Sequence, residues 1–176
     1  MYLTSRFPYA SVDNFQALEL PYQGGNVSIF ILLPKQRDGL QDLGESLTPE
    51  RLEEIQRRLY ITKVNVWIPK FKLRFEKELS PEIRALGANQ IFSGAADFSG
   101  MTSRRNVEVS QVIHKAVIEV NEKGSEAAAV TGIRIPVRSS IRRTPQFKAD
   151  HPFLFTILEK SSKSNMILFL GRVNNL

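Results

Sequence analysis

The sequence predicts an α+β fold that consists mainly of antiparallel β-strands with two or three short helices. Strand-length apolar segments recur along the chain and are separated by turns rich in glycine, proline and asparagine. The helical segments are short and carry clear start signals. With 176 residues, of which 42% are hydrophobic and 24% charged, the chain is long enough for one domain with a sizeable core.

The first elements predict a β-hairpin. Segments 15–20 and 28–33 are apolar and of strand length, and residues 21–26 between them read Pro-Tyr-Gln-Gly-Gly-Asn. This composition is typical of a turn. Pro34 ends the second strand, because proline has no backbone N–H to donate.

Two helices follow the hairpin. We expect Asp38 to cap a single turn at residues 40–43, which Gly44 closes. Residues 48–50, Thr-Pro-Glu, open a clearer helix, because threonine is a favourable N-cap and proline fits the first turn. The predicted inward face of this helix consists of Leu52, Ile55 and Leu59.

The next segments alternate in a manner typical of strands. Apolar positions 64, 66 and 68 precede a break at Pro69. Phe71, Leu73 and Phe75 then alternate with Lys70, Lys72 and Arg74. Strict alternation predicts a strand with one face in water.

A third helix precedes a strand of a different kind. Residues 80–82, Ser-Pro-Glu, cap the helix, with Ile83 and Leu86 inward and Gly87 at its end. In segment 107–120, apolar side chains occupy both alternating registers from Val112 onward. We therefore expect a central strand covered on both faces. Segments 153–158 and 166–170 predict a second hairpin at the end of the chain.

The sequence offers little for catalysis or metal binding. It has no cysteine and only two histidines, His114 and His151, and structural roles are expected for both. There are no carboxylates at ligand spacing and no phosphate-cradling glycine motif, so we expect no enzyme, no metal site and no cofactor. The longest apolar runs, 29–33 and 166–170, are far below the roughly 20 residues that cross a bilayer, so no membrane partner is expected.

The net charge of +6 is compatible with a polyanion partner such as nucleic acid or a sulfated glycan. Nearly all of the surplus can be assigned to one stretch without acids, which contains Arg134, Arg138, Arg142, Arg143 and Lys148. No pattern of aromatic and basic residues for stacking on bases accompanies it, so nucleic acid is not expected. A solvated basic loop is the favoured interpretation.

Residues 124–131 precede this basic stretch and are almost all small and uncharged, so strand, helix and loop all remain open to them. Pro136 then disfavours helix and predicts an extended, exposed loop. An extended backbone that offers arginine fits the acidic specificity pocket of a trypsin-like protease. An ordinary basic loop is the alternative.

Five motifs, taken in order, resemble landmarks of the serpin family of serine-protease inhibitors. They read LELPYQGGNVSIFILLP, WIPKFKL, GANQIFSGAADFSGM, VSQVIHKAVIEVNEKGSEAAA and FKADHPFLFTI, and together they span nearly the whole chain. The resemblance implies that residues 1–176 are the C-terminal portion of a single serpin domain whose N-terminal half is absent. The reactive loop would occupy about residues 124–145.

The resemblance also implies a suicide mechanism, in which a protease cuts the reactive loop and the freed loop inserts into a sheet as a strand. The reactive bond would be Arg138-Ser139, fourteen residues on from the first hinge residue. The hinge would consist of Gly124, Ser125, Glu126, Ala127, Ala128, Ala129, Val130 and Thr131. Glu122 and Lys70 match positions that pair near the top of the main sheet in serpins, and His114 matches a histidine beneath the strands that part.

The expected partner is a trypsin-like serine protease, and heparin or another glycosaminoglycan is a further candidate. We expect secretion, with a signal peptide in the absent N-terminal part, and glycosylation at Asn26, which begins an Asn-Val-Ser acceptor triplet. Two alternatives remain open. The chain could belong to a non-inhibitory serpin that acts as a carrier or chaperone, or to a polyanion-binding extracellular protein.

Overall fold

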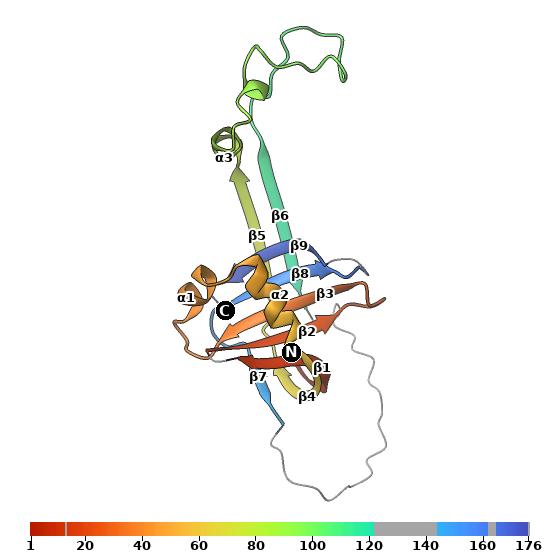
Figure 1. The fold of residues 1–176 in the computed structure, drawn as a ribbon, viewed down its shortest axis with the longest axis vertical. Coiled ribbons are helices and arrows are strands. Elements are labelled where there is room, and N and C mark those ends of the chain that lie inside the picture. Colours follow the sequence, from red (N-terminus) through yellow and green to blue (C-terminus); the bar gives the residue numbers. More distant parts are fainter. Residues whose placement is uncertain (13, 122–143, 162–164, 176) are drawn as a thin grey trace, which may run out of the picture. The chain divides into compact units, whose positions relative to one another are not determined.

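Figure 1 shows the fold in a computed structural model, which describes residues 1–12, 14–121, 144–161 and 165–175. Within these residues strands predominate, and three short α-helices accompany them. The predicted α+β class is therefore confirmed. The chain divides into two compact units, the first made of Met1–Phe71 and Val120–Leu176 and the second of Lys72–Glu119.

A seven-stranded sheet forms the centre of the first unit. Its strand order from one edge to the other is β7, β4, β1, β2, β3, β8, β9. Neighbouring strands are antiparallel except for β4 and β7, which are parallel. The strands are β1 (Tyr2–Val12), β2 (Phe15–Pro21), β3 (Val27–Pro34), β4 (Tyr60–Trp67), β7 (Gln146–Lys148), β8 (Phe153–Glu159) and β9 (Met166–Val173).

Both predicted hairpins are present. β2 pairs with β3 over its whole length, and β8 pairs with β9. The turn between β2 and β3 contains Gly24 and Gly25, whose φ angles of 92° and 77° lie in the left-handed region. Side chains other than glycine rarely adopt this region, so the glycines permit the tight connection.

Two helices cover one face of this sheet, α1 (Leu40–Glu45) and α2 (Pro49–Arg57). α2 begins as predicted, because the Thr48 hydroxyl accepts a hydrogen bond of 3.2 Å from the backbone N–H of Arg51. The core that the helices share with the sheet consists of Ala10, Phe15, Ala17, Phe30, Leu32, Leu43, Leu52, Ile55, Leu154 and Leu158. Each large apolar side chain buried in this way contributes about 1.5–3 kcal/mol.

The predicted cap of α1 is wrong. Gly39 occupies the N-cap position instead of Asp38, and no side chain caps the helix. Leu43, which is 1% exposed, instead holds α1 on the sheet. Leu59 lies beyond the end of α2 and is half-buried against the same core.

Two strands of the sheet, β1 and β7, were not predicted from the sequence. Only one face of β1 is buried near its centre, at Phe7 and Tyr9, and Pro8 between them argued against a strand. β7 is three residues long, and its extended conformation follows from pairing with β4. β1 is not regular enough, and β7 is not long enough, to predict a strand by its own pattern.

The second unit contains a two-stranded sheet of β5 (Phe71–Glu78) and β6 (Ile113–Val120), followed along the chain after β5 by α3 (Ser80–Ala85) and a 3₁₀ turn, Gln90–Phe92. The alternating segment is a strand, as predicted. Gly87 follows α3 with a φ of 96°, which agrees with its predicted place at the end of the helix.

Two predictions for the second unit are wrong. Leu86 is 87% exposed and not inward, whereas Ile83 is half-buried. Only Ile113–Val120 of segment 107–120 is a strand, and in the part of the chain that the structure describes it pairs with β5 alone, with Val117 59% exposed. Apolar side chains in both registers show that both faces are suited to burial, but they do not supply the partner that covers them.

No helix within the described residues is long and apolar enough to span a membrane.

Gly171 on β9 provides a test of how closely the sheet is packed. A Cβ atom at this position would lie 2.7 Å from Cζ of the Phe155 ring, which is 1% exposed. We expect Gly171→Ala to destabilise the fold by about 1–3 kcal/mol through overpacking. Thermal unfolding of the full-length protein measures the change.

Gly44→Ala is the matched control, because a Cβ atom at Gly44 would meet no atom within 4 Å and the residue lies inside α1. Alanine is the better helix former, so this variant should be neutral or slightly stabilised. Equal unfolding temperatures for the two variants would contradict the close packing of Gly171 against Phe155.

Candidate functional site

The predicted reactive segment lies outside the described residues. This applies to the bond Arg138-Ser139, to the whole hinge from Gly124 to Thr131, and to Glu122. The structure describes the chain on both sides of this segment, where β6 precedes it and β7 follows it. The candidate site is therefore defined by these two anchors.

β7 anchors the chain that follows the segment. The side chain of Phe147 is fully buried, and β7 runs parallel to β4. The backbone N–H of Asn65 donates to the carbonyl of Pro145 at 2.9 Å, and the N–H of Ala149 donates to the carbonyl of Trp67 at 2.9 Å. Backbone hydrogen bonds at the residues just before and just after β7, together with the buried ring of Phe147, thus fix a strand of only three residues.

Three basic side chains lie close to the carboxylate of Asp150, which is two residues beyond the end of β7. Its carboxylate lies 2.9 Å from Nδ1 of His151, 3.1 Å from Nζ of Lys148 and 3.5 Å from the guanidinium of Arg37. Arg37 also donates to the Asp150 carbonyl at 2.9 Å. The hydrogen bond from His151, and next the one from Lys148, lower the pKa of Asp150 to about 2.

His151 joins this cluster to the end of β3. Its side chain is 10% exposed, and Nε2 lies 2.6 Å from the carbonyl oxygen of Pro34. The ring thereby connects the carboxylate of Asp150 to the carbonyl oxygen of Pro34. The structural role predicted for His151 is confirmed.

The anchor before the segment is the two-stranded sheet of β5 and β6. Lys72 and Glu119 form an ion pair of 2.7 Å, and Lys115 and Glu76 form one of 3.0 Å. These side chains are about half exposed, and ion pairs of this kind contribute little, typically below about 1 kcal/mol each. β6 is therefore held mainly by its backbone pairing.

Ser80 ties the far end of this sheet together, although not as the predicted cap. Leu79 occupies the N-cap of α3, and the Ser80 hydroxyl accepts a hydrogen bond of 3.0 Å from the backbone N–H of Val112. The N–H of Leu79 donates to the Val112 carbonyl at 2.8 Å. The Ser80 N–H donates to Glu78 at 2.8 Å, and hydrogen bonds from Ser80 lower the pKa of that carboxyl.

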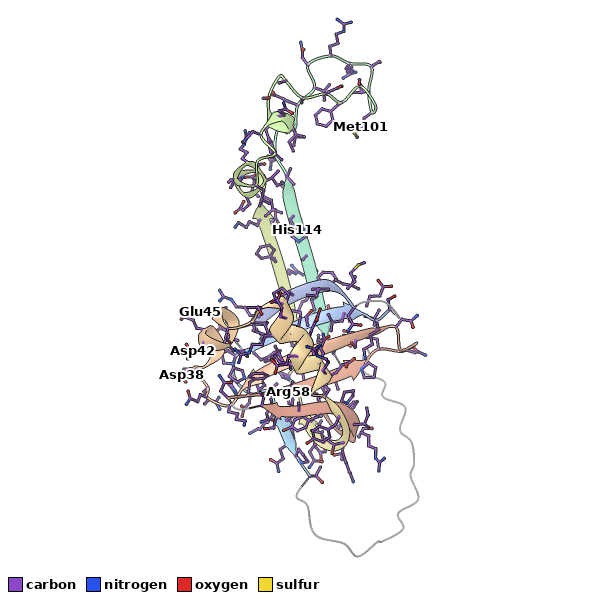
Figure 2. The ribbon with its side chains drawn as sticks, in the orientation of Figure 1. Asp38, Asp42, Glu45, Arg58, Met101 and His114 are labelled. Atoms are coloured by element: carbon purple, nitrogen blue, oxygen red, sulfur yellow. The ribbon has the colours of Figure 1, made fainter. Side chains whose placement is uncertain are left out.

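His114 projects from β6 in Figure 2, and it is exposed rather than buried. Its ring centre lies 6.2 Å from that of Phe75. The expectation that it is enclosed in a strand covered on both faces is wrong within the described residues, where β6 pairs with β5 alone. Lys70 is exposed and belongs to the first unit, and Glu122 lies outside the described residues. The joint switching role of Lys70, His114 and Glu122 therefore stays a prediction.

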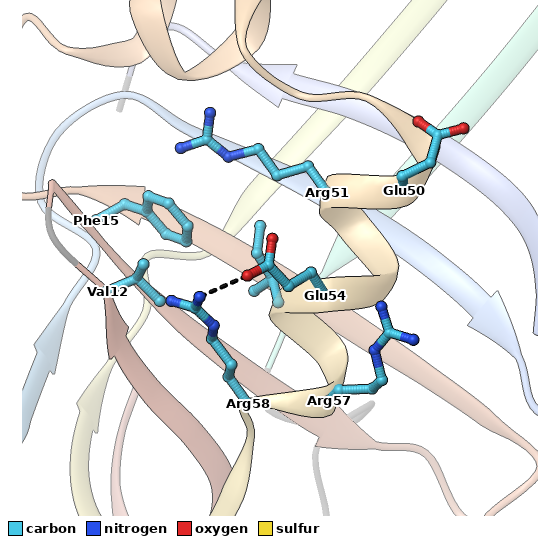
Figure 3. A pocket seen from close by; sticks show the side chains of 8 residues that line it. Val12, Phe15, Glu50, Arg51, Glu54, Arg57 and Arg58 are labelled. Atoms are coloured by element: carbon cyan, nitrogen blue, oxygen red, sulfur yellow. Dashed lines mark hydrogen bonds and ion pairs between the residues drawn. The ribbon is translucent and has the colours of Figure 1, made fainter.

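A pocket of about 530 Å³ lies beside α2 and is lined mainly by charged side chains of α2 and of Arg58 at its end (Figure 3). Its charged groups engage neighbouring parts of the chain: Arg58 pairs with Glu54 at 2.5 Å, and Arg51 donates to the Ser46 carbonyl at 3.2 Å. The Arg51 guanidinium also lies 6.0 Å from the ring centre of Phe15. Arg58 and Glu54 thus pair along the helix itself, whereas Arg51 contacts the loop before α2 and, at Phe15, the sheet.

Comparison with known proteins identifies the family. The family model of serpins, described as serine protease inhibitors, matches residues 1–176. The chain belongs to the serpin family. The order and content of the five sequence motifs are thereby explained, and the predicted membership is confirmed.

Individual serpins are similar over nearly the whole chain. Intracellular coagulation inhibitor 2 of Tachypleus tridentatus is 43% identical over 178 residues, covering 100% of this chain. Iripin-8 of Ixodes ricinus is 42% identical over 98% of the chain, and Serpin B3 of Homo sapiens is 42% identical over 96%. The crystal structure of uncleaved ovalbumin superposes with a TM-score of 0.79, at 33% identity over 98% of the chain.

The chain spans less than half the length of these serpins. It covers 43% of the Tachypleus protein, 44% of Iripin-8 and of Serpin B3, and 43% of the ovalbumin chain. The sequence similarity and the fold are therefore established for this portion of a serpin. The activity of the whole protein is proposed below.

The Asp150 cluster predicts a specific dependence of stability on pH. A carboxyl whose pKa is lowered by folding stabilises the protein above its unfolded pKa of about 3.9, and this contribution is lost as the pH falls towards 2. We expect Asp150→Asn to lower the unfolding temperature of the full-length protein at pH 6, and the difference from the wild type to shrink between pH 4 and pH 2. Asp38→Asn, which removes an exposed carboxylate that caps no helix, is the control. A constant difference between the wild type and Asp150→Asn across this range would show that the ion pairs are not what stabilises the site.

Proposed function

We propose that this chain is the portion of a serpin that carries the reactive loop, and that the protein inhibits trypsin-like serine proteases. One feature carries the proposal: a run of small residues followed by arginines, in the sequence between two strands of a serpin, at residues 124–139. The names of the Tachypleus relatives, intracellular coagulation inhibitors 1 and 2, describe those proteins as inhibitors and support the proposal.

The proposed mechanism has two steps. The protease serine attacks the carbonyl carbon of Arg138, the peptide bond to Ser139 breaks, and an acyl-enzyme forms while the new amino terminus departs. The freed segment from Gly124 onward then inserts into a sheet as a strand. The serpin is consumed rather than acting as an enzyme.

The two described anchors support this mechanism because they hold opposite ends of the segment. β7 and the Asp150 cluster fix the chain beyond Ser139, so the peptide after the cut stays attached to the first unit. Residues with small side chains in the hinge favour insertion over the non-inhibitory alternative, because a strand that enters a packed sheet must place alternate side chains in its interior.

Arg138→Ala tests the reactive bond. The full-length protein should form a complex with trypsin that survives a denaturing gel as a band of summed mass, since the acyl bond is covalent. Arg138→Ala should abolish this band, whereas Arg134→Ala, which removes an arginine from the same loop, should retain it. An unchanged complex with Arg138→Ala would place the reactive bond elsewhere.

Ala127→Arg tests hinge insertion. A charged side chain in the hinge should stop the loop from entering the sheet, so that trypsin cuts the variant at the same bond and is released. The same gel should show a cleaved serpin without the complex, and a cleavage rate close to that of the wild type. Full inhibition by Ala127→Arg would refute insertion as the mechanism.

Secretion and glycosylation belong to the proposal as well. Asn26 is exposed in the turn between β2 and β3, as an acceptor for an oligosaccharide must be. The names of the two Tachypleus relatives include the word intracellular, so the names of relatives do not support secretion. The proposal of a glycosaminoglycan partner is based on the net charge of +6.

Expression of the full-length protein in a secreting eukaryotic cell tests these two points. The medium should contain a protein whose mass falls on enzymatic removal of N-linked glycans, and Asn26→Gln should remove one glycan. Retention of the wild type inside the cell would refute secretion, and an unchanged mass for Asn26→Gln would refute the acceptor site.

A further inference from the structure

The chain between the 3₁₀ turn and β6 carries two adjacent arginines, Arg104 and Arg105. We call this stretch, residues 93–112, the arginine loop, and it contains neither helix nor strand. Both arginines are exposed, and among the residues that the structure describes neither guanidinium forms an ion pair. Figure 2 labels Met101 in the same loop, and this side chain is 85% exposed. The loop thus offers a pair of arginines to solvent.

The backbone around the pair is held by local contacts. The N–H of Arg104 donates to the hydroxyl of Thr102, two residues away, at 3.2 Å. Asn106, directly after the pair, has a φ of 61°, in the left-handed region that asparagine tolerates better than most residues. A protease must draw several residues of its substrate into an extended conformation. A loop with local contacts makes this change more easily than a strand paired in a sheet.

The other arginines that the structure describes are less suited to cleavage. Arg37 lies in a turn, but its guanidinium contacts both the carboxylate and the carbonyl of Asp150. The rest belong to β1, β5, β9 and α3, or to α2 and its C-cap. A protease would have to unfold these elements before it could cut after their arginines. The pair at 104 and 105 is therefore the favoured site.

Three hydrogen bonds close the base of the arginine loop. The N–H of Val109 donates to the Ile91 carbonyl at 2.8 Å, and the N–H of Leu79 donates to the Val112 carbonyl at 2.8 Å. The N–H of Val112 donates to the Ser80 hydroxyl at 3.0 Å. With the pairing of β5 and β6, these contacts hold the chain on both sides of the pair. A cut between them would leave the two parts associated until the protein is denatured.

The arginine loop also lies on the covalent path to the proposed reactive bond. It leads directly into β6, and β6 precedes the segment that contains Arg138. In the proposed mechanism, a protease acylated at Arg138 is joined to the serpin through this segment, β6 and then the loop. A second cut after Arg104 or Arg105 would interrupt the path and leave the protease joined to a short fragment.

We propose that the Arg104–Arg105 pair is a second cleavage site for arginine-specific serine proteases, at which the covalent connection between the serpin and an acylated protease is severed. The cleavage itself does not depend on inhibition, whereas its effect on the complex rests on the proposed function.

The cleavage is an ordinary hydrolysis. The protease serine attacks the carbonyl carbon of either arginine, and its catalytic histidine takes the serine proton. The peptide bond breaks, and the new amino terminus departs with that proton. Water then hydrolyses the acyl-enzyme, which leaves a carboxylate on the arginine and restores the protease.

The first experiment follows this cut without inhibition. The full-length variant Arg138→Ala is treated with a small amount of trypsin, and new amino termini are identified by mass spectrometry. A terminus at Arg105 or Asn106 should appear early. The two parts should stay together in size-exclusion chromatography and separate on a denaturing gel, because hydrogen bonds and strand pairing hold them.

Arg104→Gln/Arg105→Gln in the same background removes the cation that the acidic specificity pocket of trypsin binds. Cleavage in the arginine loop should slow by at least about tenfold, because one partner of a buried charge pair is lost. The unfolding temperature should be unchanged, since both side chains are exposed. Arg104→Lys/Arg105→Lys should be cut, because the charge is retained. Arg57→Gln/Arg58→Gln, which removes the same charge at α2, should be cut in the arginine loop like its parent.

The second experiment tests the effect on the complex. The covalent complex of the wild type with trypsin is isolated and treated with fresh trypsin. On a denaturing gel its mass should fall to that of trypsin with a fragment ending at Arg138. The complex of Arg104→Gln/Arg105→Gln should keep the serpin residues that precede the pair.

Two outcomes would overturn the proposal. Either no terminus at Arg105 or Asn106 forms while the protein is folded, or Arg104→Gln/Arg105→Gln loses the same part of the serpin from its complex as the wild type does. A wild type that forms no complex with trypsin, but is cut at the pair, would refute the proposed inhibition and retain the cleavage site.

Discussion

The pairing of β3 with β8 is the contact on which the rest of the first unit depends. Ile29 lies opposite Ile157 and Ile31 opposite Phe155, and these strands are more than 120 residues apart in the sequence. The entropic cost of closing so long a loop grows only slowly with its length. Burial on both faces of the sheet offsets this cost. Everything between the two strands, the proposed reactive segment included, therefore belongs to one long loop that this pair closes at its base.

A single carboxylate supplements this closure at the point where the chain returns. Three residues of parallel pairing with β4 would be a weak hold for β7, since few hydrogen bonds are available to it. Asp150 adds contacts to Lys148 on the same segment, to Arg37 beyond β3 and to His151, which in turn reaches Pro34. Because these partners come from both ends of the long loop, the cluster fixes β7 against the end of β3. A reactive loop that is cut while its far end stays in place requires an attachment of this kind.

The distribution of positive charge has a meaning in three dimensions that it lacks along the chain. In sequence, the densest basic stretch lies in residues 134–148, and it attracts attention first. In the fold, Arg6, Lys63 and Lys148 come from three distant segments and meet on one side of β1, β4 and β7. The serpin portion thus carries two basic features, one in the sequence of the proposed reactive loop and one on a face of the sheet.

The sequence by itself determined the family, the α+β class, both hairpins, and the start of α2 at Thr48, because local signals such as glycine turns, caps and alternating apolar residues carry this information. Tertiary structure alone decided β7, the Asp150 cluster and the placement of Arg6, Lys63 and Lys148 on one side of the sheet, since each depends on pairing between residues far apart in the chain. It also decided against burial of Leu86 and His114 in the described residues. A pattern can show that a side chain is suited to burial, but only a neighbouring element can cover it.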